Sequence, residues 1–209
     1  MLADKGEIDQ ARAQLSAISP QDPSQVARLY LADAQILRDA GRVPESGKVL
    51  TAALEELPDN SDLLYARAMD EDKLGDFAAM EKDLRRILAH EPDNVDALNA
   101  LGYSLADHTT HYDEALKYIQ RALELHPDSY FILDSMGWVQ YHLGHYSEAT
   151  SYLRRALDLS SDSEVAAHLT EVLWVMGDKR GARAVWDKAL KAAPGNKTLL
   201  DVMNRLDHK

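Results

Sequence analysis

The sequence contains no cysteine, so disulfide bonds, thiolate metal sites and lipid-modified cysteines are excluded within these 209 residues. A chain without cysteine suits both reducing and oxidising compartments, so its composition is as compatible with the cytoplasm as with the periplasm. No stretch approaches the roughly 20 consecutive apolar residues of a membrane-spanning helix.

Basic residues are also in short supply. The 23 Lys and Arg residues stand against 35 Asp and Glu, which gives a formal net charge of −12. Nucleic-acid binding depends on Lys and Arg that neutralise phosphates, and anionic membrane surfaces likewise attract basic segments. The composition therefore argues against both as partners. Hydrophobic residues still make up 45% of the chain, which is enough for a continuous core.

Catalytic motifs are missing as well. The chain has no nucleophile elbow, no glycine loop that could cradle a phosphate and no Cys–His pair. His108 and His111, like His142 and His145, lie beside expected turns, and solvated turn residues are a more economical interpretation than metal ligands. We therefore predict no enzymatic activity, no cofactor and no metal site.

Glycine and proline, in contrast, recur at a fixed interval. Four prolines stand 34, 35 and 67 residues apart, namely Pro58, Pro92, Pro127 and Pro194. Four glycines recur in the same way, namely Gly41, Gly75, Gly144 and Gly177. Each precedes a proline by 17 residues, except that Ser161 occupies the proline position after Gly144. Self-similarity near 34 residues is the signature of an array of helix–turn–helix repeats.

Small residues recur where the two helices of each repeat must approach closely. They are Gly102 and Gly137 on the first helices and Ala115, Ala149, Ala182, Ala122, Ala156 and Ala189 on the second helices. Within each second helix the two alanines are seven residues apart, which is about two turns, so they share one face. Large apolar residues that fill the space between helices include Leu101, Met136, Leu153 and Trp186.

The alignment predicts an all-α fold of five helix pairs in a single array over residues 1–209. The pairs are 24–39/44–57, 61–74/77–90, 95–107/112–125, 129–142/146–159 and 163–176/179–193, within repeats 24–58, 61–92, 95–127, 129–161 and 163–194. A half-repeat at 1–20 precedes them, which indicates a fragment of a longer protein, and a closing helix at 196–207 follows. The turn glycines supply the positive φ that ends a helix, and Asn60 and Asn94 are expected helix N-caps.

These residues resemble the tetratricopeptide repeat (TPR). Its pattern combines the small residues above with a closing proline and an aromatic residue two positions after the turn glycine. Phe77 and Tyr146 occupy the aromatic position, while Val43 and Lys179 depart from it. The resemblance covers nearly the whole chain and implies a right-handed superhelical solenoid, in which each repeat contacts its neighbours.

A narrower resemblance concerns two stretches, residues 97–149 (ALNALGYS to GHYSEA) and 164–190 (EVAAHLTE to WDKAL). They are similar to the C-terminal part of proteobacterial outer-membrane TPR lipoproteins. One member of that group is an adaptor that binds a periplasmic C-terminal processing protease and brings cell-wall hydrolases to it as substrates. The resemblance implies a periplasmic, outer-membrane-anchored protein regulating a protease, with a lipidated N-terminal cysteine outside this sequence.

In this repeat the first helix of each pair lines the concave surface, where an aromatic stripe interleaved with carboxylates is expected. The residues predicted to bind a protein or peptide there are Tyr65, Met69, Asn99, Tyr103, Asp134, Trp138, Tyr141, Glu171 and Trp174. Aromatic side chains with a polar group are favoured interface anchors. Because an acidic groove repels an acidic segment, the expected partner is neutral to basic. The alternative is that some aromatics pack between repeats, Trp174 foremost.

The function predicted from the sequence is therefore a non-enzymatic interaction scaffold, specifically the protease adaptor. Two other functions stay open. One is a TPR assembly factor, such as a pilotin-type lipoprotein or a secretion chaperone. The other is self-assembly into a homo-oligomer through the N-terminal half-repeat, whose Ile8, Leu15 and Ile18 are expected to be exposed.

Overall fold

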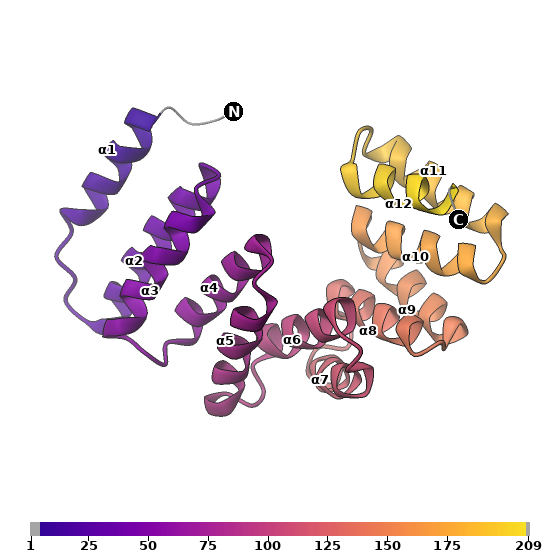
Figure 1. Ribbon diagram of the computed structural model, residues 1–209, viewed down its shortest axis with the longest axis horizontal. Coiled ribbons are helices and arrows are strands. Elements are labelled where there is room, and N and C mark those ends of the chain that lie inside the picture. Colours follow the sequence, from indigo (N-terminus) through magenta and orange to yellow (C-terminus); the bar gives the residue numbers. More distant parts are fainter. Residues whose placement is uncertain (1–4, 208–209) are drawn as a thin grey trace. The chain divides into compact units, whose positions relative to one another are not determined.

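The computed structural model describes residues 5–207, which fold into consecutive α-helices with no strand among them (Figure 1). The twelve helices within this range are α1 (Lys5–Ser16), α2 (Pro23–Asp39), α3 (Val43–Glu56), α4 (Ser61–Leu74), α5 (Phe77–His90), α6 (Val95–His108), α7 (Tyr112–Leu125), α8 (Tyr130–His142), α9 (Tyr146–Leu159), α10 (Ser163–Val175), α11 (Lys179–Ala192) and α12 (Lys197–Asp207). The predicted all-α fold is confirmed. Each boundary predicted for the five pairs lies within one residue of the observed one.

The turns inside the pairs follow the glycine positions. Gly41, Gly75, Gly144 and Gly177 have φ between 73° and 86°, the left-handed region that L-residues with a Cβ rarely adopt. The pair α6/α7 has no glycine in its turn, and Thr109 closes it instead. Its hydroxyl donates to the carbonyl of Leu105 at 2.6 Å and accepts from the backbone N–H of His111 at 3.0 Å.

Asparagine begins the first helix of two repeats, as the sequence predicts. The side chain of Asn60 accepts a hydrogen bond from the N–H of Leu63 at 3.0 Å, and Asn94 accepts one from Ala97 at the same distance. Each bond satisfies a backbone donor that has no partner within the helix. The repeat boundary is therefore encoded locally.

The chain forms two compact units, one up to Ala97 and one from Leu98 onward, and we describe each by itself. In the N-terminal unit, α2 packs on α3, α3 on α4 and α4 on α5. Leucine and isoleucine side chains that are almost fully buried make its core, namely Leu37, Leu50, Leu63, Leu64, Leu84 and Ile87. Arg67 forms a bidentate ion pair with the buried Asp83, in which Nε and Nη2 lie 2.7 and 2.8 Å from the two carboxylate oxygens.

The prediction that the N-terminal half-repeat exposes Ile8 is wrong. Helix α1 packs on α2, and Ile8 is only 7% exposed because it lies in that contact. Ile18, which follows α1, is exposed at 52%, and Leu15 is half-buried. The apolar surface left open at this end is therefore smaller than the sequence suggests.

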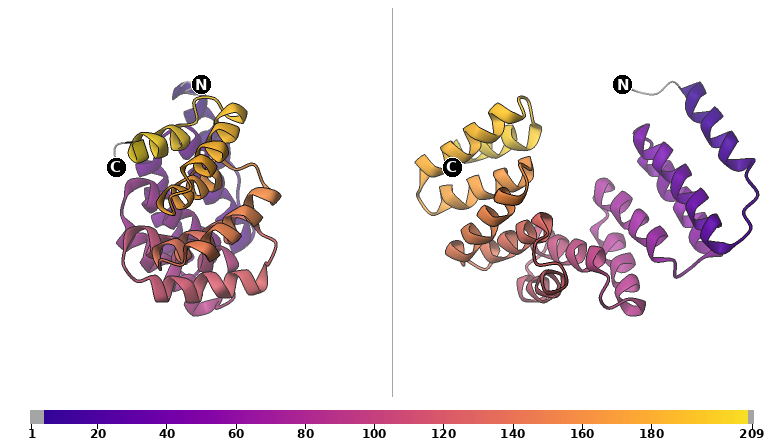
Figure 2. Two further views of the ribbon diagram at one scale, coloured as in Figure 1. Left: turned by 90° about the vertical axis from the view of Figure 1, so that its right-hand side faces the viewer. Right: turned by 180° about the vertical axis from the view of Figure 1, so that it is seen from behind.

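In the C-terminal unit, α8 packs on α9, and α10 contacts α9, α11 and α12 (Figure 2). Glycine permits the closest approaches. A Cβ added to Gly137 would lie 2.6 Å from Cγ of Leu153, and one added to Gly102 would lie 2.7 Å from Cδ1 of Ile119. The first-helix positions predicted to be small for close packing are confirmed. Within residues 5–207 no helix is long and apolar enough to cross a bilayer.

Candidate functional site

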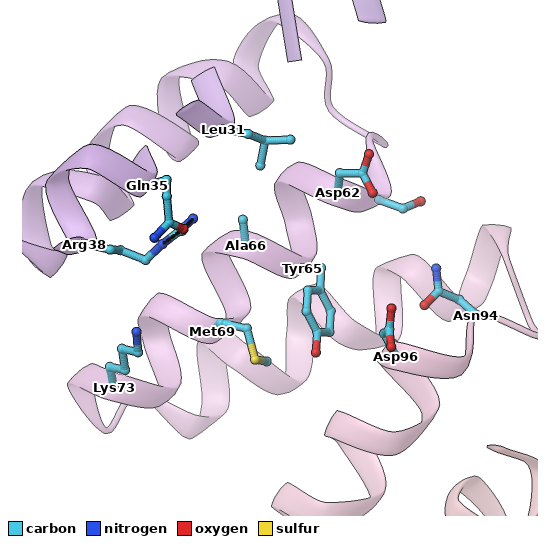
Figure 3. Close-up of a pocket in the computed structure, with 11 residues that line it drawn as sticks. Leu31, Gln35, Arg38, Asp62, Tyr65, Ala66, Met69, Lys73, Asn94 and Asp96 are labelled. Atoms are coloured by element: carbon cyan, nitrogen blue, oxygen red, sulfur yellow. Dashed lines mark hydrogen bonds between the residues drawn. The ribbon is translucent and has the colours of Figure 1, made fainter. Parts of the chain in front are cut away.

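The first helices of successive pairs line a hollow in each unit. The N-terminal hollow has a volume of about 460 Å³ and is formed by α2, α4 and the start of α6 (Figure 3). Its lining residues are Leu31, Gln35, Arg38, Ser61, Asp62, Tyr65, Ala66, Met69, Lys73, Asn94 and Asp96. Arg38 and Lys73 balance Asp62 and Asp96, so this hollow carries little net charge.

Tyr65 occupies the middle of the N-terminal hollow, between Met69 and Asp96 (Figure 3). Burial and the neighbouring carboxylate of Asp96 raise the pKa of the Tyr65 phenol, so the hydroxyl stays protonated. Arg38 donates to Oε1 of Gln35 at 2.9 Å and lies 3.6 Å from the buried Asp70, which fixes one wall. The arrangement offers a half-buried aromatic and a thioether beside polar groups, which suits a peptide side chain.

The C-terminal hollow, of about 360 Å³, is formed by α6, α8, α10 and α12. Its lining residues are Tyr103, Asp107, Trp138, Glu164, Ala167, His168, Glu171, Thr198, Asp201, Val202 and Arg205. Four of these are carboxylates, whereas Arg205 is the only lysine or arginine among the lining residues. The hollow is therefore acidic.

Stacked rings support the C-terminal hollow. The Trp138 ring lies 4.1 Å from the His168 ring at 22°, and 5.1 Å from the Tyr141 ring at 27°. Trp138 is only 7% exposed, and its indole N–H donates to Oδ1 of Asp107 at 2.9 Å. Because the indole stacks on two rings and is bonded at its nitrogen, its position is fixed, and it also orients one carboxylate.

His168 forms a buried pair with Asp134. A carboxylate only accepts hydrogen bonds, so Nδ1 of His168 is the donor, at 2.9 and 3.1 Å from the two carboxylate oxygens of Asp134. The two residues are 8% and 6% exposed. Burial opposes a charge on His168, but the Asp134 carboxylate outweighs it and raises the pKa of the imidazole above its usual value.

Two tyrosines fix two further carboxylates. Tyr103 donates to Glu164 at 3.3 Å, and Tyr141 donates to Glu171 at 3.4 Å. Burial raises the pKa of both phenols, that of Tyr141 to about 12, so both remain donors at neutral pH. Arg205 of α12 bonds the second oxygen of Glu171 at 2.7 Å. Three carboxylates around the hollow are thus held in fixed positions by neighbouring donors.

The predicted binding residues that line a hollow are divided between the two units. Tyr65 and Met69 line the N-terminal hollow, and Tyr103, Trp138 and Glu171 line the C-terminal one. Tyr141 and Asp134 do not line the C-terminal hollow, but they contact residues that do: Tyr141 contacts Trp138 and Glu171, and Asp134 contacts His168. Binding by these residues stays a prediction.

Two predicted residues lie elsewhere. Trp174 packs against both apolar clusters of the C-terminal unit, with Nζ of Lys179 4.7 Å from its ring centre, so it serves the packing of α10 on α11. Asn99 is half-buried in α6, and its Oδ1 has no hydrogen-bond partner among the described residues.

Sequence reasoning missed His168 and Arg205. Each is one repeat length, 34 residues, from the acid that it contacts, Asp134 and Glu171 respectively. That spacing is a signal that a search for opposite charges at equivalent repeat positions would have found. No group of three or more His, Asp or Glu side chains within the described part of the chain is placed to hold a metal ion.

Comparison with known proteins agrees with this architecture. Over 171 residues the chain is 43% identical to the TPR repeat-containing protein PA4667 of Pseudomonas aeruginosa, covering 82% of the chain and 29% of that relative. A solved tetratricopeptide repeat protein of Parabacteroides merdae superposes with a TM-score of 0.81 at 20% identity, covering 98% and 81% of the two chains. The Pseudomonas aeruginosa protein PilF gives a TM-score of 0.70 at 21% identity, covering 88% and 84%.

At these identities the two solved structures show the fold alone, and they confirm the TPR solenoid that the sequence predicts. Family models of the tetratricopeptide repeat match residues 2–61, 65–130 and 106–174. These matches cover well over half of the sequence. The chain therefore belongs to the tetratricopeptide repeat family.

Proposed function

We propose that the chain is a non-enzymatic scaffold that binds a segment of a partner protein through its first-helix face, which is the surface that lines the hollow of each unit. The TPR fold supports an interaction scaffold in general, and the location of the binding surface is our inference. One observation carries it: in the C-terminal hollow, Trp138, Tyr103 and Tyr141 each hold a carboxylate in place. Pre-organised polar groups beside rigid aromatic rings are what a recognition site needs, because little ordering remains to oppose binding.

The electrostatics favour a basic partner. The C-terminal hollow carries Asp107, Glu164, Glu171 and Asp201 against Arg205, which is already bonded to Glu171. A segment rich in carboxylates would be repelled there, whereas a segment with Lys or Arg would be attracted. The net charge of −12 over the whole chain acts in the same direction during the encounter.

As to biological role, we propose an adaptor for a periplasmic C-terminal processing protease, in a full-length protein anchored at the outer membrane. The support is the resemblance of residues 97–149 and 164–190 to lipoprotein adaptors of that kind. The chain spans only 29% of the length of its Pseudomonas relative, so the anchor and the remaining contacts of such an adaptor would belong to other parts of a longer protein.

A binding measurement with two matched variants tests this proposal. The chain is immobilised on a sensor, and its binding of a purified periplasmic C-terminal processing protease is measured by biolayer interferometry. Glu164 and Glu148 are both exposed glutamates in the first turn of a helix, α10 and α9 respectively, but only Glu164 lines the hollow. Their charge reversals therefore have the same effect on net charge and a similar effect on the helix dipole.

We expect saturable binding of the protease to the wild type, at least tenfold weaker binding to Glu164→Lys, and binding within twofold of the wild type for Glu148→Lys. No binding of the protease to the wild type would refute the adaptor role. Equal weakening by the two substitutions would refute the location of the site on the first-helix face.

A further inference from the structure

His168 gives the C-terminal hollow a buried polar floor. Its side chain is nine-tenths buried, and its Nδ1 donates to Asp134. The other ring nitrogen, Nε2, has no partner among the described residues, although His168 lines the hollow. Because Nε2 is not a fully buried atom, it is open to a hydrogen bond with a ligand atom in the hollow.

The walls above His168 supply carboxylates in fixed orientations. Glu164 is held by the Tyr103 hydroxyl and Asp107 by the Trp138 indole, so each has one oxygen engaged by a neutral donor. A neutral donor orients a carboxylate without cancelling its charge. A positive charge on His168 would be matched by the Asp134 carboxylate, which lies 2.9 Å from Nδ1. An excess of negative charge therefore remains at the walls.

We propose that the C-terminal hollow binds the side chain of an arginine from a partner segment, and that Nε2 of His168 forms a hydrogen bond with a polar atom of the same segment. The guanidinium has five N–H donors in a planar fork, so it bonds oriented carboxylates more completely than the ammonium of lysine does. This inference rests on the proposed function, because it names the chemistry of the segment that the first-helix face would bind.

The tryptophan indoles provide a built-in reporter for this proposal. Trp138 donates its N–H to Asp107 in the hollow, whereas Trp186 donates its N–H to the carbonyl of Leu199 at 2.6 Å, and neither Trp186 nor Leu199 lines the hollow. An arginine bound at Asp107 alters the first hydrogen bond and leaves the second unchanged. In a nitrogen-15 NMR spectrum of the three indoles, the signals of Trp138 and Trp186 therefore report the occupied and the reference positions in the same sample.

The experiment titrates the labelled chain with a blocked glycine pentapeptide that carries arginine at its centre. The matched probe carries citrulline, which has nearly the same shape but no charge. We expect a saturable shift of the Trp138 signal with the arginine peptide, no shift of the Trp186 signal, and at least tenfold weaker binding of the citrulline peptide. Glu164→Gln should weaken binding of the arginine peptide at least threefold, and Glu148→Gln should leave it unchanged.

Equal affinity for the arginine and citrulline peptides, or no Trp138 shift with either, would overturn the inference. The same holds if both glutamine variants weaken binding alike. These outcomes are distinct from failure of the proposed adaptor role. If the protease binds the wild type but the two peptides bind equally, only the arginine site is refuted. If the hollow prefers the arginine peptide but the protease does not bind, only the adaptor role is refuted.

Discussion

A glycine-to-alanine substitution is expected to have opposite effects at two helical positions of this chain. At Gly137 in α8, a new Cβ would lie 2.6 Å from Cγ and 2.9 Å from Cδ2 of Leu153, and 3.2 Å from the carbonyl oxygen of Ala149. Carbon atoms in contact prefer separations of about 3.5–4.0 Å. The branch point of a fully buried leucine and a backbone oxygen must therefore both move to make room.

Gly47 in α3 is the matched control. It is also helical, but an added Cβ would meet no atom within 4 Å. Alanine is favoured over glycine in a helix interior by about 1 kcal/mol, since it restricts the unfolded chain. Gly47→Ala should therefore raise the free energy of unfolding by about 0.5–1 kcal/mol.

At Gly137 the same gain is opposed by overpacking, which costs about 1–3 kcal/mol in a well-packed core. We expect Gly137→Ala to lower the free energy of unfolding by about 1–2 kcal/mol once the helix gain is subtracted. For a chain of this size each kcal/mol corresponds to a shift in melting temperature of about 2–4 °C. Urea denaturation followed by circular dichroism at 222 nm measures both variants. A Gly137→Ala protein as stable as the wild type would refute the argument that close approach of α8 and α9 requires glycine.

Two further predictions concern pH. Burial and the nearby Asp83 raise the pKa of Glu71 to about 7, above its ordinary value of 4.5, so the folded state loses stability as pH rises through this window. Glu71→Gln should match the stability of the wild type near pH 5 and exceed it by about 1–2 kcal/mol near pH 8. Urea denaturation at both pH values measures this difference, and a difference that is independent of pH would contradict the raised pKa of Glu71. For His168 the folded pKa is raised, so the stability from its pairing with Asp134 is fully present below pH 6.5 and is lost as pH rises through the folded pKa. Asp134→Asn should therefore destabilise by about 3 kcal/mol near pH 6 and by clearly less near pH 9, where equal losses would exclude a charged pair.

The helix pairs were predictable because their signals are local. A positive φ favours glycine wherever the turn occurs, and an asparagine can cap a helix using atoms three residues away. Gly75 and Asn60 therefore mark their turns regardless of what packs on them, and the observed helices begin and end within one residue of the predicted bounds. The period of these signals also identified the repeat, which the family matches confirm.

The binding residues were only partly predictable, because a helical position sets a direction but not a contact. Trp174 was expected on the groove, yet it packs between α10 and α11 beside Lys179. Asp134 was expected to face a partner, yet it is buried with His168, and Ile8 is covered by α2.

The sequence by itself determined the repeat, the helices, the acidic character of the chain and the aromatic residues of its first helices, since all of these depend on composition and on spacing within one or two turns. Only the tertiary structure decided which of those aromatics line a hollow and which carboxylates they hold. The physical reason is that the deciding hydrogen bonds join residues 30 to 34 positions apart. These bonds are Trp138 to Asp107, Tyr141 to Glu171 and His168 to Asp134. Such contacts exist only once neighbouring repeats have packed, and their geometry depends on the separation between helices that residues such as Gly137 permit.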